Sequence, residues 1–99
     1  MDFEIQYHRS FNLDVLEIID WYSFESEMVA KRFVTQLEWK LESIIDTPEI
    51  FIEINKGYRK ASLQDFPYAV YFEMKKNTLR FLTVVHHSRH PSTWKKRKR

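Results

Sequence analysis

The chain has 99 residues, of which 43% are hydrophobic and 16% aromatic, so it can bury the core of one domain over residues 1–99 and is not a disordered polymer. Its net charge is only +2 and it has no cysteine, which excludes disulfide bonds and thiolate metal sites. Acidic residues interrupt the first 20 positions and no apolar run is long enough for a signal core or a membrane span, so we expect a cytoplasmic protein without membrane association.

The first half of the chain predicts one strand followed by a pair of helices. Residues 3–8 alternate between apolar and polar side chains, which is the pattern of a half-buried strand. From Phe11 onward apolar residues recur at helical spacing, which predicts a helix capped near Ser10 or Asn12. After a short break around Ser23, a second and longer helix is indicated by Ala30, Phe33, Leu37, Leu41 and Ile44.

Pro48 marks the end of this helix, and the pattern then changes to three strands at 58–63, 68–75 and 78–87. The last strand is apolar on both faces, so we place it centrally in the sheet. Uninterrupted alternation assigns one face to Leu79, Phe81 and Val85 and the other to Leu82 and Val84. The order β-α-α-β-β-β predicts an α+β fold whose helix hairpin covers one sheet face and leaves the other available for a ligand.

The charge is distributed unevenly along the chain. Thirteen of the fourteen acidic residues lie in residues 1–65, whereas residues 75–99 contain nine Lys or Arg, three His and no acid. A basic tail covers about residues 88–99. Such a local excess of positive charge attracts phosphate, an anionic lipid surface or an acidic partner, and composition does not choose among them.

Several segments together resemble the RelE/ParE toxins, also described as plasmid-stabilisation proteins. The resemblance spans nearly the whole chain and is carried by Ser26 to Phe33, Pro48, Arg59, Phe66-Pro67-Tyr68, Val84-Val85-His86, Arg89-His90-Pro91 and Trp94. It implies a RelE/ParE-like fold and a growth-inhibiting toxin that a cognate antitoxin neutralises. Members either cut mRNA on the ribosome or poison DNA gyrase without being nucleases, and the shared fold does not settle which.

The predicted catalytic group consists of Arg59, His86, His87 and Arg89. Cleavage at an RNA 2′-hydroxyl needs a proton acceptor, a proton donor and cations around the phosphate, which these residue types supply without a metal or cofactor. Successive strand positions point to opposite faces, so at most one of the two histidines shares a face with Arg59. The alternative is that all four are surface residues at a strand end. We favour a ribosome-dependent mRNA endonuclease, with gyrase inhibition as the alternative.

A second group is predicted to bind RNA or its phosphates: Lys60, His90, Trp94, Lys95, Lys96 and Arg97. Ribosome-dependent members often carry a tyrosine about where this chain has Trp94. An indole cannot give or take a proton in that way, although it can stack on a base. The alternatives are that Trp94 anchors the tail in the core and that the terminal cations are solvated.

Trp39 lies roughly opposite Leu37 and Leu41 on the second helix, among polar residues. This position predicts a contact for an acidic, partly helical antitoxin, and the alternative is packing along neighbouring side-chain stems. No metal site is predicted, because His86 and His87 diverge along a strand and the spacing matches neither zinc nor iron.

Overall fold

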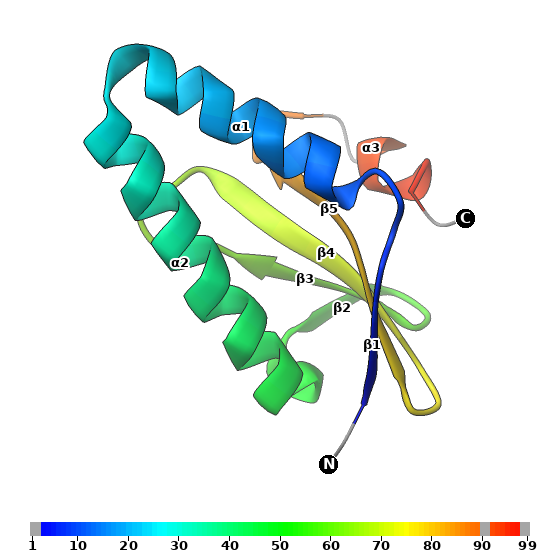
Figure 1. The fold of residues 1–99 in the computed structure, drawn as a ribbon. Coiled ribbons are helices and arrows are strands. Elements are labelled where there is room, and N and C mark those ends of the chain that lie inside the picture. The colour runs from blue at the N-terminus through cyan, green and yellow to red at the C-terminus, as the bar shows by residue number, and fades with distance from the viewer. Residues whose placement is uncertain (1–2, 90–91, 98–99) are drawn as a thin grey trace.

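The computed structural model describes residues 3–89 and 92–97, in which two long helices cover one face of a five-stranded sheet (Figure 1). The elements are, in chain order, β1 (Glu4–Tyr7), α1 (Phe11–Glu25), α2 (Glu27–Asp46), η1 (Pro48–Ile50), β2 (Ile52–Asn55), β3 (Tyr58–Ser62), β4 (Tyr68–Lys75), β5 (Thr78–His86) and α3 (Ser92–Lys95). The long helices precede four of the five strands, which confirms the predicted α+β fold.

The strand order in the sheet is β1-β5-β4-β3-β2. Strands β2 to β5 form an antiparallel meander, whereas β1 pairs in parallel with β5. As predicted, β5 is an interior strand, because it lies between β1 and β4. The meander contains one strand more than predicted. This extra strand, β2, is only four residues long and mostly exposed, and its apolar-polar alternation is too short to distinguish a strand from a loop by periodicity alone.

The helix hairpin is present, but its break lies at Ser26 and not around Ser23. Ser26 has an extended backbone, and its hydroxyl accepts a hydrogen bond from the Val29 amide at 3.3 Å, which caps α2. Ser10 occupies the predicted N-cap position of α1. Its hydroxyl contacts Nδ1 of His8 at 2.8 Å instead of capping the helix.

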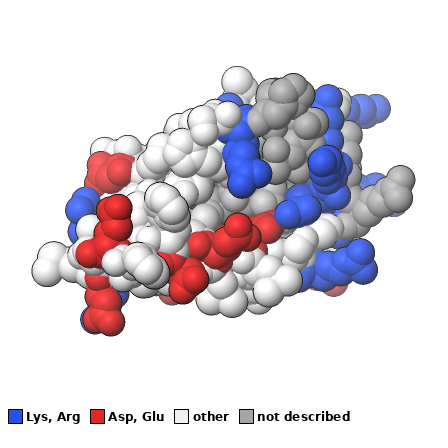
Figure 2. Space-filling view, turned by 90° about the horizontal axis from the view of Figure 1, so that it is seen from above, with Lys and Arg blue, Asp and Glu red and all other residues white. Residues whose placement is uncertain are grey.

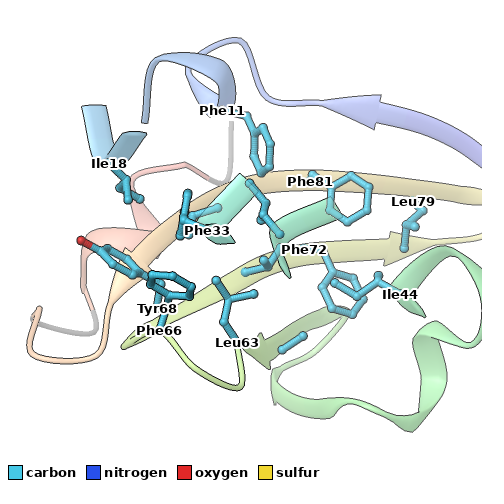
Figure 3. Close-up of a cluster of buried hydrophobic side chains, with 14 residues drawn as sticks. Phe11, Ile18, Phe33, Ile44, Leu63, Phe66, Tyr68, Phe72, Leu79 and Phe81 are labelled. Atoms are coloured by element: carbon cyan, nitrogen blue, oxygen red, sulfur yellow. The ribbon is translucent and has the colours of Figure 1, made fainter. Parts of the chain in front are cut away.

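The core lies between the helix hairpin and the sheet (Figure 3). Aromatic rings from α1, α2, β4 and β5 meet there, and the side chains of Phe33, Phe72 and Phe81 are completely buried. The remaining members of the buried cluster are Phe11, Ile18, Leu37, Ile44, Ala61, Leu63, Phe66, Tyr68, Val70, Leu79 and Val84.

A β-bulge in β5 changes which side chains reach this core. The register between β4 and β5 shifts at Leu82, which has no direct partner on β4. The extra residue inverts the alternation beyond it, so Val84 joins Phe81 in the buried cluster. The prediction that Val84 faces away from Phe81 was therefore wrong. His86, two residues further along β5, lies on the helix side of the sheet with Val84.

The face opposite the helix hairpin is partly covered by the C-terminal segment, whereas the sequence predicted an open face. Tyr71 alternates with the buried Val70 and Phe72, so its ring lies on this opposite face. Trp94 of α3 stacks on Tyr71 with a centroid distance of 5.9 Å and also contacts Tyr58 at 5.3 Å. Only 4% of Trp94 is exposed, so the residue anchors α3 to the sheet.

Candidate functional site

A cleft of about 410 Å³ lies between α1 and the C-terminal end of β5. Its walls include Glu17 and Trp21 from α1, and the buried strand residues 83–85 from β5. Two of the predicted catalytic residues, His86 and Arg89, also line this cleft. The structure therefore brings these two residues together in one cleft, beside acidic and aromatic side chains of α1.

Asp14 of α1 connects three elements at this cleft. Its carboxylate accepts a hydrogen bond from the Thr83 hydroxyl of β5 at 2.8 Å. It also accepts two hydrogen bonds from the Arg97 guanidinium, at 3.1 and 3.2 Å. Both side chains of this ion pair are less than one-third exposed. A two-pronged, partly buried pair of this kind fixes the end of the C-terminal segment against α1.

His86 has a defined hydrogen-bonding state. The Ser88 amide donates to Nδ1 at 3.0 Å, and the Ser88 hydroxyl contacts the same atom at 2.8 Å. Because Nδ1 accepts from an amide, the neutral ring carries its proton on Nε2. The ring lies edge-on to Tyr68 at 5.1 Å, which holds its orientation. His87, in contrast, is exposed beyond the end of β5.

The tyrosine hydroxyls beside His86 remain protonated at neutral pH. Burial raises the pKa of Tyr68, and its hydrogen-bonded neighbour Tyr22 raises it further, whereas Arg89 lowers it. Burial likewise raises the pKa of Tyr22. Neither hydroxyl can therefore act as a general base near pH 7.

Arg59 lies at a different place in the sheet. It pairs with Phe72 on β4, whereas His86 pairs with Tyr68, four residues away along the same strand. At about 3.3 Å per residue and two strand spacings, the two backbones are about 16 Å apart. The Arg59 guanidinium donates to the Phe51 carbonyl at 2.7 Å, on the side of β3 away from β5.

The predicted phosphate-binding residues that the structure describes lie on β3 and in the C-terminal segment. Lys60 lies on β3, across from Tyr71, and Lys95 and Lys96 are exposed on α3 and just after it. Arg97 is engaged with Asp14, as described above, and His90 lies outside the described residues.

The surface of the helix hairpin carries large apolar side chains, of which only Trp39 was identified from the sequence. Trp39 is 66% exposed, as its position on α2 predicted, and its contact with a partner stays a prediction. Further exposed apolar side chains follow the outer side of α1 and the start of α2, namely Leu13, Leu16, Trp21, Phe24 and Met28. The available signal was that α1 is apolar on its outward positions as well as its inward ones.

A sequence model of the ParE toxin of the type II toxin-antitoxin system parDE matches residues 5–91. The chain belongs to this family. A solved structure described as "Chromosomal ParDE TA system from P. aeruginosa" is similar to this ParE-family chain with a TM-score of 0.73 and 16% identity, covering 85% of this chain and 95% of that one. At this identity the likeness concerns the fold, and it confirms the predicted RelE/ParE-like arrangement. No curated protein sequence is significantly similar to the chain.

Membership in the ParE family confirms the predicted class, the toxin of a toxin-antitoxin pair, and with it a cognate antitoxin as partner. Within residues 3–89 and 92–97, no group of three or more His, Cys, Asp or Glu is arranged to hold a metal ion. No helix in the described part of this ParE-family toxin is long and apolar enough to cross a membrane.

Proposed function

We propose that this ParE-family toxin inhibits DNA gyrase by binding to it and not by cutting RNA. The observation that supports this most is the separation of Arg59 from His86 and Arg89. Proton transfer requires hydrogen-bond reach of about 2.6–3.2 Å between catalyst and substrate. One phosphodiester at the cleft cannot also be contacted by a guanidinium that is held on the far side of β3.

The position of Trp94 supports the same proposal. The ring is buried between α3 and the sheet, so it is not displayed for stacking on a base. An indole also cannot transfer a proton as a tyrosine can. The C-terminal segment therefore contributes anchoring and exposed positive charge, which are properties of a binding protein.

The alternative, a ribosome-dependent mRNA endonuclease, has one observation in its favour. His86 and Arg89 line one cleft, and the neutral imidazole has its Nε2 proton available for donation. Such an enzyme would have to work without Arg59. Its general base would have to come from a group other than the protonated tyrosines beside the cleft.

The experiment that separates the two functions uses purified toxin in two assays. The first assay combines relaxed plasmid, gyrase and ATP, and it measures supercoiling and trapped DNA breaks. The second uses a reconstituted translation system and measures cleavage of ribosome-bound mRNA. We expect loss of supercoiling and intact mRNA. Ribosome-dependent cleavage that is lost in His86→Gln and retained in the matched control His87→Gln would contradict the proposal.

We propose further that the cognate antitoxin is acidic and partly helical and that it contacts Trp39 and the basic C-terminal segment. Helix α2 and α3 lie on opposite faces of the sheet, so a partner that contacts both must be extended and pass around an edge. Ordering upon docking is typical of such wrapping partners.

A further inference from the structure

A second concave surface, of about 900 Å³, lies at the end of the sheet away from the helix turn. It is formed by β1, the residues that follow it, and the hairpin of β4 and β5. Four cations line it, namely Arg9, Lys75, Lys76 and Arg80, together with the carboxylate of Glu73. We call this surface the basic concavity. None of these four cations belongs to the predicted catalytic or phosphate-binding groups.

The single lining carboxylate is already engaged within the protein. The Tyr58 hydroxyl is hydrogen-bonded to Glu73. The positive charge of Arg80 lies close enough to this hydroxyl to lower its pKa. Burial raises the pKa of Tyr58, and the negative charge of Glu73 raises it further. Glu73 and Arg80 thus offset each other, and the remaining charge of the concavity comes from Arg9, Lys75 and Lys76.

Within residues 3–89 and 92–97, none of these three cations is held in an ion pair. The ion pairs of Arg32 with Asp65 and of Arg97 with Asp14 lie elsewhere on the molecule. On β1, Glu4 lies across from Thr78 and accepts a hydrogen bond from Gln6 at 3.3 Å. Even when Glu4 is counted with Glu73, four cations stand against two carboxylates, which leaves a local charge of +2.

The hairpin of β4 and β5, which bears Lys75 and Lys76, projects from the sheet (Figure 1). Lys76 adopts a left-handed backbone with φ 57°, which makes the turn tight and places Lys75 and Lys76 at its tip. A two-stranded ribbon of this kind has the dimensions to enter the major groove of a duplex. On the face seen from above in Figure 2, which is the side of α1 and α3, Lys and Arg gather at one end and Asp and Glu lie mainly over the rest.

Tyr7 adds an aromatic ring to the wall of the concavity. It is 50% exposed, although its inner side packs on Phe11 and Phe81 with centroid distances of 5.3 Å. A ring that is fixed on one side and open on the other can stack on a base or sugar. Exposed rings interleaved with cations are typical of surfaces that bind nucleic acid.

We propose that the basic concavity binds the phosphodiester backbone of a nucleic acid. Lys75, Lys76 and Arg9 contact phosphates, and Tyr7 contacts an adjacent sugar or base. The inference is independent of gyrase inhibition, because it concerns binding of nucleic acid by the toxin alone.

The test measures anisotropy of a labelled DNA duplex of two helical turns, and of a single-stranded RNA, with the full-length toxin at several salt concentrations. The variant is Arg9→Gln/Lys75→Gln/Lys76→Gln. The matched control, Lys31→Gln/Arg32→Gln/Lys40→Gln, removes three positive charges from α2. The C-terminal cations are present in all three proteins, so their contribution cancels. Thermal unfolding shows whether each variant is folded.

We expect the variant to bind at least about tenfold more weakly than the control, and its salt slope to fall by about 3 because each phosphate contact releases counterions. The natural ligand is the polymer, duplex DNA or single-stranded RNA, for which the affinity of the variant falls further below that of the control. Equal affinities and slopes for variant and control would overturn the proposal. So would displacement of the nucleic acid by polyglutamate at equal charge concentration, because the surface would then recognise any acidic polymer.

Discussion

Replacing Trp94 with Ala tests how firmly the C-terminal segment is attached to the sheet. The indole is 4% exposed and lies against Tyr58 and Tyr71. Truncation of a buried tryptophan to alanine costs about 3–5 kcal/mol, depending on how well the cavity closes. Trp94 is not part of the cluster between helices and sheet, so α3 can detach without disturbing that cluster. We therefore expect a loss near the lower limit, about 3 kcal/mol of unfolding free energy.

The assay is urea unfolding followed by circular dichroism, with tryptophan fluorescence as a second measurement. Trp21 and Trp39 are both 66% exposed, so Trp94 should supply the blue-shifted emission that iodide does not quench. The control Trp94→Phe keeps an aromatic ring on Tyr71 and should lose less stability than Trp94→Ala. Two results would refute the docking of α3: a loss below about 1 kcal/mol in Trp94→Ala, or blue-shifted emission that persists in this variant and is still not quenched by iodide.

Four further results are expected. A double-mutant cycle with Asp14→Asn and Arg97→Gln should give a coupling free energy of about 1 kcal/mol, and additive losses would show that the ion pair does not stabilise the fold. Burial raises the pKa of Tyr71 above 10.0, so the stability of its protonated form is present below about pH 10 and lost as the pH rises through the folded-state pKa. Tyr71→Phe should therefore reduce the alkaline loss of stability in urea titrations at increasing pH, whereas an unchanged profile would assign that loss to other groups. Trp39→Ala should weaken antitoxin binding in calorimetry and leave the melting temperature unchanged, and unfolding of this variant would instead make Trp39 a core residue. Arg59→Ala should lower the free energy of unfolding by at least about 3 kcal/mol, because two hydrogen bonds from a charged donor are lost, and a stable but non-toxic variant would point to catalysis.

The helix hairpin and the strands β3 to β5 were predictable because their apolar periodicity is strong. The edge strand β2 was not, because three of its four residues are exposed. Its best signal is the turn that follows, where Gly57, the only glycine in the chain, has φ +82°. A glycine between two short β-rich segments favours a hairpin, so the turn together with the brief alternation of Ile52 to Asn55 could have indicated β2.

The bulge at Leu82 explains the wrong face assignment in β5. In a continuous apolar run every position can be buried, so the sequence pattern is the same whether or not the strand contains one extra residue. The break in register becomes visible only from the pairing with β4. The same shift decides that His86 is on the helix side, next to Tyr68, which periodicity along β5 alone could not show.

The residues of the cleft were only partly predictable. His86 and Arg89 were proposed from their chemical types, and the structure places both at one cleft. Asp14 was missed, because it is 83 positions from Arg97 and no local pattern relates an acid on α1 to a cation at the C-terminus. Such long-range pairs follow from the packing of α1 and α3 beside β5, which only the fold defines.

Arg59 shows how the same residue type takes a structural role when its position changes. Its guanidinium donates to the carbonyls of Phe51 at 2.7 Å and Glu49 at 3.3 Å, and so fixes the connection between α2 and β2. Its Nε is buried with no hydrogen-bond partner among the described residues. To reach a phosphate, the side chain would have to give up both hydrogen bonds, each worth about 1.5–3 kcal/mol when the donor is charged. Contact with the phosphate would have to contribute at least that much free energy, and the two carbonyls would be left to be solvated. A side chain that already satisfies two backbone carbonyls of the connection between α2 and β2 is therefore poorly placed for transition-state stabilisation, and this favours toxicity through binding.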